Sequence, residues 1–452
     1  MYRYTLPGSV ASGFLILLVL ANIADAQTSS ETIETATHSL AAPVHQNTGV
    51  PTLRWEAFPP PAASYTIHKS VRGSAANTAA EHCIAALLDE HSETRGRSLE
   101  FFGYVQQGVT FNSESPGNRT NGPVVPNYRA NDYQFNGLYF VSQRNVDPNR
   151  GHIQLGGRAD LLYGTDGAFN LSDGFDQNIS SGERFYKLAL PQLYGNLYLP
   201  VGRGMSFKFG KFFTTVGNEV KYNPSNFFYS YYLTFNLQPG NHTGVIGETE
   251  LTDNIHVRFG PNFGWNTSEN SNESISYVGD LRYQSTDKRS ELTFAFQTGR
   301  QQTRIVTADA NVTVYSLIFK QDVNTDWRFM LEHDLLVSDS EVGIPADDFE
   351  AYSLVGYLFR NIDQHWRAGV RLEWLRDDDG FVKPFESTSP SAPGSYYEVT
   401  LGLNWRPRPH LRIRPEIRYD HQARDDKSIP AAFDEGNSAD QWLFSCDALW
   451  EF

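Results

Sequence analysis

The C-terminal stretch Asp440-Gln-Trp-Leu-Phe-Ser-Cys-Asp-Ala-Leu-Trp-Glu-Phe452 decides the fold class. Every second residue in it is apolar, namely Trp442, Phe444, Cys446, Ala448, Trp450 and Phe452. Successive side chains of a β-strand point to opposite faces, so this stretch predicts a strand with one apolar and one polar face. Strands in soluble sheets usually have about 5–6 residues, whereas a tilted strand needs about 10 to cross a bilayer. The length therefore favours a membrane barrel over a soluble sandwich.

The same alternation continues upstream, in residues 365–376, 395–406 and 410–420. We expect sixteen strands. They are placed at residues 98–110, 134–143, 150–163, 185–199, 204–213, 242–251, 254–264, 275–285, 289–299, 311–321, 325–335, 350–360, 365–376, 395–406, 410–420 and 440–452.

The connections between these strands alternate between short and long, and the longest covers residues 214–241. Outer-membrane barrels have this asymmetry, with short periplasmic turns, long extracellular loops and an even number of strands. The predicted fold is therefore all-β: a transmembrane antiparallel β-barrel of about sixteen strands with both termini in the periplasm.

The N-terminal region differs from the rest. Arg3, the apolar run at residues 14–20 and the small-residue site Ala24-Asp-Ala26 predict a signal peptide at residues 1–26, with a membrane anchor as the alternative. Residues 27–97 are rich in Thr, Ser, Ala and Pro, which predicts a mostly disordered periplasmic leader. Residues 98–452 form the predicted barrel, which places the protein in the outer membrane.

Composition excludes several classes of protein. Beyond residue 26 no apolar run reaches the roughly 18 residues of a spanning helix, and two cysteines exclude a disulfide scaffold. The net charge of -15 argues against a nucleic-acid partner.

No G-x-S-x-G, H-E-x-x-H or P-loop motif occurs, so we expect no enzyme, no cofactor and no resident metal. Ca²⁺ binding by the aspartate clusters at residues 347–348, 377–379 and 425–426 is one interpretation, and simple solvation of loop tips is the other.

Several motifs resemble one family. Gly103-Tyr-Val-Gln-Gln-Gly108, Gln134-Phe-Asn-Gly-Leu-Tyr139, Gly217-Asn-Glu219 and His242-Thr-Gly-Val245 look like motifs of the putative β-barrel porin-2 (OmpL-like) family. The resemblance covers residues 98–452, with Tyr104 as a mild departure, and it implies a porin without naming a solute. Trp450 and the terminal Phe452 also resemble the assembly signal of outer-membrane proteins, which implies recognition by the barrel-assembly machinery.

Alternation also predicts which charges face the lumen. The predicted pore-lining residues are Arg367, Arg371, Glu373, Glu398, Arg412, Arg414, Glu416 and Arg418. Five arginines against three glutamates leave a formal excess of +2 on this wall, which predicts a mild preference for anions.

Connection 214–241 is rich in aromatic residues that would be poorly placed in a solvated outer loop. We expect it to fold inward and constrict the pore, with packing on a neighbouring subunit or on the rim as the alternative. The candidate constriction residues are Glu219, Lys221, Tyr222, Phe227 and Tyr229.

A barrel of sixteen strands is too wide for side chains to fill, so it leaves a water-filled channel unless it is plugged. The predicted function is passive diffusion of small hydrophilic solutes or ions. The alternatives are an outer-membrane barrel enzyme, of the protease or lipase type, and a structural or adhesive barrel. Expected partners are outer-membrane lipid, the assembly machinery and the solutes, and assembly into a homo-oligomer is left open.

Overall fold

The structure is a computed structural model that describes residues 99–148, 151–183, 185–270, 273–301, 310–340, 349–382 and 393–452. The predicted signal peptide and leader, residues 1–26 and 27–97, lie outside these ranges. Within the described ranges, no helix has the length and apolar character needed to cross a membrane.

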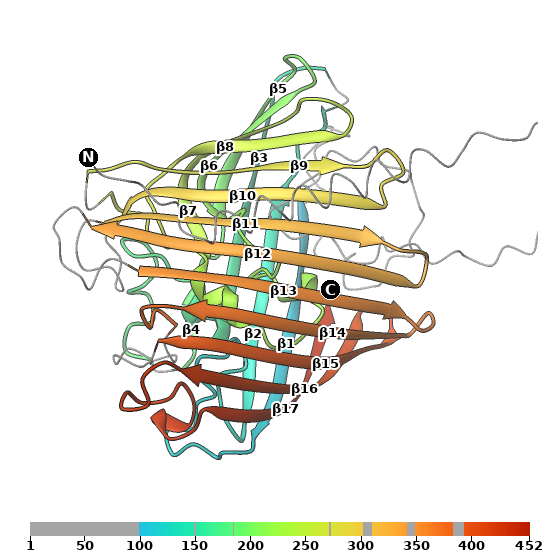
Figure 1. Ribbon diagram of the computed structural model, residues 1–452. Helices are drawn as coiled ribbons and strands as arrows, with labels where there is room; N and C mark the ends of the chain where they lie inside the picture. The colour runs from blue at the N-terminus through green and yellow to red at the C-terminus, as the bar shows by residue number, and fades with distance from the viewer. Residues whose placement is uncertain are drawn as a thin grey trace, which may run out of the picture. The chain divides into compact units, whose positions relative to one another are not determined.

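The described residues form one sheet in which each strand pairs with its neighbours and β1 pairs with β17, so the sheet closes into an antiparallel barrel (Figure 1). The strands are β1 (Glu100–Asn112), β2 (Asp132–Arg144), β3 (Gln154–Gly164), β4 (Lys187–Ala189), β5 (Leu193–Leu199), β6 (Met205–Phe213), β7 (Asn241–Glu250), β8 (Ile255–Asn262), β9 (Ser276–Gln284), β10 (Ser290–Gln301), β11 (Ala310–Asp322), β12 (Trp327–Ser340), β13 (Phe349–Asn361), β14 (Trp366–Asp377), β15 (Gly394–Arg408), β16 (Leu411–Arg424) and β17 (Asp440–Glu451). Short 3-10 helices occur at η3 (Thr165–Phe169), η4 (Asn223–Ser225), η5 (Leu233–Leu237) and η6 (Asp434–Gly436).

The barrel has sixteen strands although seventeen segments are labelled. β4 and β5 both pair with β3, through Leu162 opposite Ala189 and Ala159 opposite Leu193. They are two parts of one strand, interrupted at residues 190–192, and together they match the predicted strand 185–199. The predicted antiparallel barrel of sixteen strands is confirmed.

The two ends of the barrel carry different connections. Short turns such as residues 200–204, 323–326 and 409–410 lie at one end, and long connections such as residues 113–131 and 214–240 lie at the other. The chain enters β1 and leaves β17 at the short-turn end. There the amide of Gly103 donates to the carbonyl of Phe452 (2.9 Å), and the amide of Phe452 donates to the carbonyl of Gly103 (3.0 Å).

Polar and apolar side chains are distributed in the opposite way to a soluble protein, with apolar residues on the outer face and polar residues on the inner face. In β15, Val399 and Leu401 on the outer face are 41% and 52% exposed, whereas Glu398 and Thr400 on the inner face are almost fully buried. Leu372 in β14 and Phe444 in β17 also face outward, with about half of their surface exposed. The apolar outer face is the face that suits contact with lipid.

The outer face generates the first prediction. Leu401 lies at the middle of β15, so Leu401→Arg places a charge near the bilayer midplane and should lower the free energy of unfolding by about 2–4 kcal/mol. Urea unfolding in lipid vesicles measures this change. As a control, Ile362→Arg adds the same charge to an exposed short turn and should change stability little. Equal stability of wild type and Leu401→Arg would contradict the assigned outer face.

Candidate functional site

The connection between β6 and β7, residues 214–240, folds into the barrel, and we call it the inner loop. Most of its aromatic residues are buried: Phe228 is 2% exposed, and Tyr229 and Tyr232 are each 1% exposed. The helix η5 within it lies against β13 and β14. The inner loop therefore occupies part of the lumen and packs against the inner face of the wall.

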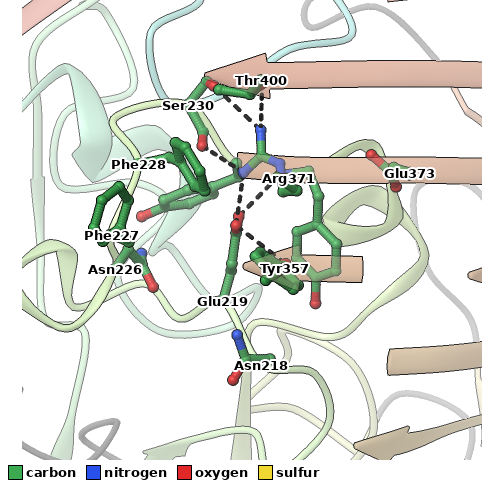
Figure 2. A network of polar contacts seen from close by, with 12 residues as sticks. Asn218, Glu219, Asn226, Phe227, Phe228, Ser230, Tyr357, Arg371, Glu373 and Thr400 are labelled. Atoms are coloured by element: carbon green, nitrogen blue, oxygen red, sulfur yellow. Dashed lines mark hydrogen bonds and ion pairs between the residues drawn. The ribbon is translucent and has the colours of Figure 1, made fainter. Parts of the chain in front are cut away.

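Arg371 of β14 is the central contact between wall and loop (Figure 2). Its guanidinium pairs with Glu219 of the loop (2.6 Å) and with Glu398 of β15 (2.9 Å). It also donates to the carbonyl of Ser230 (2.9 Å), and its carbon Cζ lies 4.9 Å from the ring centre of Phe228. One buried arginine thus connects two strands with two segments of the inner loop.

Two wall glutamates bind amide groups of the loop. Glu416 accepts hydrogen bonds from the amides of Tyr229 (2.8 Å) and Ser230 (3.0 Å). Glu373 accepts hydrogen bonds from the amides of Leu233 (2.7 Å) and Thr234 (2.6 Å). These last two amides open η5, and the first N–H groups of a helix have no partner within it. Glu373 therefore acts as an external cap for η5.

Three arginines of β16 bind carbonyl groups of the loop. Arg414 donates to the carbonyls of Asn226 and Phe228, both at 3.0 Å. Arg418 donates to the carbonyl of Tyr231 (2.5 Å), and Arg412 donates to that of Asn226 (3.3 Å). The arginines also pair with acidic residues, Arg414 with Asp447 (2.6 Å), Arg418 with Asp420 (2.8 Å) and Arg412 with Glu451 (3.2 Å).

Glycines of the wall make room for the aromatic rings of the loop. A Cβ atom at Gly402 would lie 2.8 Å from Phe228, and one at Gly369 would lie 2.5 Å from Phe227. A Cβ atom at Gly108, on the other side of the seam between β1 and β17, would lie 2.7 Å from the hydroxyl of Tyr229. The rings fill the space that wall side chains would otherwise occupy.

The remaining candidates of the inner loop are also buried. Tyr222 packs edge-on against Tyr104 and Tyr139, with ring centres 5.3 Å apart in both cases. Lys221 donates to the carbonyl of Phe169 in η3. Burial, together with the nearby positive charge of Lys211, lowers the pKa of Lys221 to about 7, and Asp176 opposes this shift.

The comparisons with known proteins agree with this geometry. The profile of a protein family described as "Putative beta-barrel porin-2, OmpL-like" matches residues 98–452. The chain belongs to this family. The protein is thus an outer-membrane porin, a barrel that forms a channel. No curated protein matches the sequence significantly.

Solved structures share the fold of this porin at low sequence identity. OmpT of Vibrio cholerae in its trimer form is 11% identical with a TM-score of 0.54, covering 79% of this chain and 100% of that one. The channel DcaP of Acinetobacter baumannii is 11% identical with a TM-score of 0.53, covering 79% and 98%. The anion-selective porin of Comamonas acidovorans is 9% identical with a TM-score of 0.51, covering 79% and 100%.

The charge assigned to the wall of the porin from its sequence needs correction. The prediction counted five arginines and three glutamates. The structure adds Glu219, Asp420, Asp447 and Glu451 as partners of these arginines, which makes seven carboxylates against five arginines. Arg371, Arg412, Arg414 and Arg418 are at most 1% exposed, whereas Arg367 keeps part of its surface accessible. This wall therefore carries no formal positive excess.

Sequence reasoning missed a second segment inside the porin. In the first connection, residues 113–131, Val124 and Tyr128 are at most 1% exposed, and the carbonyl of Val125 accepts a hydrogen bond from the amide of Tyr231 (2.7 Å). The signal that could have revealed it is the apolar sequence Pro123-Val-Val-Pro126 within a predicted loop.

The aspartate clusters have local partners in the described residues. Asp377 accepts hydrogen bonds from the amides of Phe381 and Val382, both at 2.8 Å. Arg376 pairs with Asp378 (2.5 Å) and Asp425 (2.6 Å). Asp347 and Asp348 lie outside the described ranges. Within the described part of the chain, no group of three or more His, Cys, Asp or Glu side chains is arranged to hold a metal ion.

The glycine contacts generate the second prediction. Gly402→Ala should displace the ring of Phe228 and lower the free energy of unfolding by about 1–3 kcal/mol, because overpacking a filled interior is destabilising. Chemical unfolding in detergent measures the loss. Gly356→Ala is the matched control, since a Cβ atom at Gly356 would meet nothing within 4 Å. Equal stability of the two variants would show that the wall glycines do not accommodate the loop.

Proposed function

We propose that this porin allows passive diffusion of small hydrophilic solutes and ions through a water-filled lumen that the inner loop narrows. The observation that carries the proposal is a set of hydrated charges on the inner face beyond the loop. Glu291 of β10 and Lys320 of β11 pair at 3.6 Å, and each keeps 22% of its side-chain surface exposed. Arg328 and Asp322 pair at 2.5 Å with 24% and 20% exposed. Charges that contact water inside a barrel favour hydrophilic solutes.

The inner-loop residues Glu219, Lys221, Tyr222, Phe227 and Tyr229 are the proposed constriction. In this proposal the wall charges around Arg371 act by fixing the position of the loop, because they are buried beneath it. The width available to a solute then depends on these contacts.

We propose that the porin performs no chemical reaction. The pair His421 and Asp440 (2.7 Å) has catalytic residue types, but both side chains lie on the apolar outer face. The carboxylates at the inner loop bind backbone amides and arginines, as described above. These arrangements favour a channel over a barrel enzyme of the protease or lipase type. An adhesive barrel is the other alternative, and stepwise conductance in planar bilayers would distinguish the channel from both.

Ion preference is proposed to arise at the short-turn rim. Arg328, Arg367 and Arg406 face the lumen there and lie within range of mutual electrostatic repulsion, and Arg412 lies on the next strand. Asp322 pairs with Arg328 and Glu451 pairs with Arg412, so four arginines and two carboxylates leave a formal excess of +2. This excess favours a mild preference for anions.

The third prediction tests this rim. In a KCl gradient the wild-type channel should show a reversal potential of the sign that indicates anion preference. Arg367→Ala combined with Arg406→Ala should shift the potential towards cations, because the rim loses its excess charge. Arg360→Ala is the control, since Arg360 lies on the outer face with its guanidinium 5.2 Å from the ring centre of Trp327. Cation preference of the wild type would contradict the proposed rim.

Targeting and assembly form the last part of the proposal. Residues 1–26 would act as a cleaved signal peptide, residues 27–97 would remain as a periplasmic leader, and the barrel-assembly machinery would recognise Trp450 and Phe452. Two backbone hydrogen bonds between Phe452 and Gly103 at the closing seam support a role of the terminal residue in closure. Assembly into a homo-oligomer is also proposed, because the similar OmpT structure is described as a trimer form.

The fourth prediction concerns this terminus. Deleting Phe452 removes both hydrogen bonds to Gly103 and the terminal aromatic ring, so folded barrel in outer-membrane fractions should fall severalfold. Heat-modifiable migration on gels measures the folded fraction. Phe452→Trp retains an aromatic terminus and should preserve assembly. Normal levels of the truncated chain would contradict the assembly role.

A further inference from the structure

Two carboxylates lie together between the inner loop and β12, a strand that is four positions from β16 in the barrel. Glu332 and Asp334 are both on the inner face of β12, and each is 0% exposed. Glu332 accepts hydrogen bonds from the amide of Asn218 (3.0 Å) and the hydroxyl of Tyr232 (3.1 Å). Asp334 accepts one from the side-chain amide of Gln238 (2.8 Å). Among the described residues, no Lys, Arg or His forms an ion pair with either carboxylate.

Three oxygen atoms in this cluster have no hydrogen-bond partner among the described residues. They are Oε2 of Glu332, Oδ2 of Asp334 and Oγ of Ser353. Ser353 of β13 is 1% exposed and lies directly opposite Asp334 in the strand pair. Opposite residues in an antiparallel pair project to the same face about 4.5–5.5 Å apart, so the Ser353 hydroxyl is aimed at Asp334. On the other side of Asp334, the hydroxyl of Ser316 in β11 donates to Oδ1.

Two adjacent buried carboxylates need either a compensating cation or a shared proton. Removing a carboxylate from water without a compensating charge is costly, and mutual repulsion adds to that cost. The open oxygens come from two carboxylates and a hydroxyl, which are hard ligands. Ca²⁺ prefers such oxygen ligands and tolerates irregular coordination better than Mg²⁺ does.

We propose that Glu332, Asp334 and Ser353 form a binding site for a divalent cation of the calcium type. The site joins strands β12 and β13 to the inner loop, because the same carboxylates bind Asn218, Tyr232 and Gln238 of that loop. Bound calcium neutralises the pair and holds the loop on the side that the arginines of β16 do not reach. This inference concerns metal binding and does not depend on the solute or ion preference proposed above.

The test uses the full chain, refolded in detergent without lipopolysaccharide and stripped with EDTA. Calorimetric titration with CaCl2 should show binding at this site, and Ca²⁺ should raise the thermal unfolding midpoint of the wild type, because a ligand that binds only the folded state stabilises it. Glu332→Gln combined with Asp334→Asn should abolish both effects. In EDTA the double variant should unfold at or above the wild-type midpoint, since it lacks the repulsion.

Two further variants keep the test decisive if the double variant fails to fold. Ser353→Ala removes one ligand and should weaken Ca²⁺ binding by at least about tenfold, with little change in the midpoint in EDTA. Glu291→Gln is the matched control, because Glu291 is an inward acid with its own partner Lys320, and this variant should bind Ca²⁺ as the wild type does.

Two results would overturn the proposal. Absence of Ca²⁺ binding and of any midpoint shift in the wild type would show that the two carboxylates share a proton instead. Unchanged Ca²⁺ binding in both Ser353→Ala and the double variant would place the ion elsewhere, for example at the exposed aspartates around Arg376.

Discussion

The arrangement of the lumen depends on one requirement: the backbone of the inner loop must find hydrogen-bond partners where water is excluded. Buried N–H and C=O groups without partners are costly. Here the wall supplies the partners, since Glu373 and Glu416 bind amides of the loop, and Arg414 and Arg418 bind its carbonyls. A polar inner face, which a water-filled barrel needs in any case, is thereby also the surface that holds an irregular segment in place.

The barrel itself could be predicted from the sequence because its signal is local. Burial of the outer face in lipid imposes a period of two on each strand, and β15 shows the predicted faces residue by residue. Ion pairing could not be predicted in the same way, because it depends on register between strands. Arg414 meets Asp447 only because these residues stand opposite each other in β16 and β17. Alternation within one strand carries no information on which residues of the next strand lie opposite.

Contacts between loop and wall were predictable in kind but not in detail. The aromatic residues of the inner loop indicated burial, whereas nothing in the sequence connected Phe227 and Phe228 with Gly369 and Gly402. Glycine normally weakens a strand, since it has no side chain to pack. At Gly369 and Gly402 the structure requires a residue without a side chain, because an aromatic ring of the inner loop fills the space that the side chain would occupy. Only the folded chain shows why a glycine is suited to such a position.

Charges inside this barrel differ in function according to hydration. Arg371 is fully buried and balanced by Glu219 and Glu398, so its field largely cancels at a distance and its role is positional. Removing one partner would leave an uncompensated buried charge, which is strongly destabilising. At the short-turn rim, Arg328, Arg367 and Arg406 keep part of their surface accessible, so they can attract or repel a passing ion without such a penalty. In the proposed channel, the buried contacts around Arg371 set the width and the partly exposed arginines at the rim set the ion preference, so we expect the two properties to change largely independently.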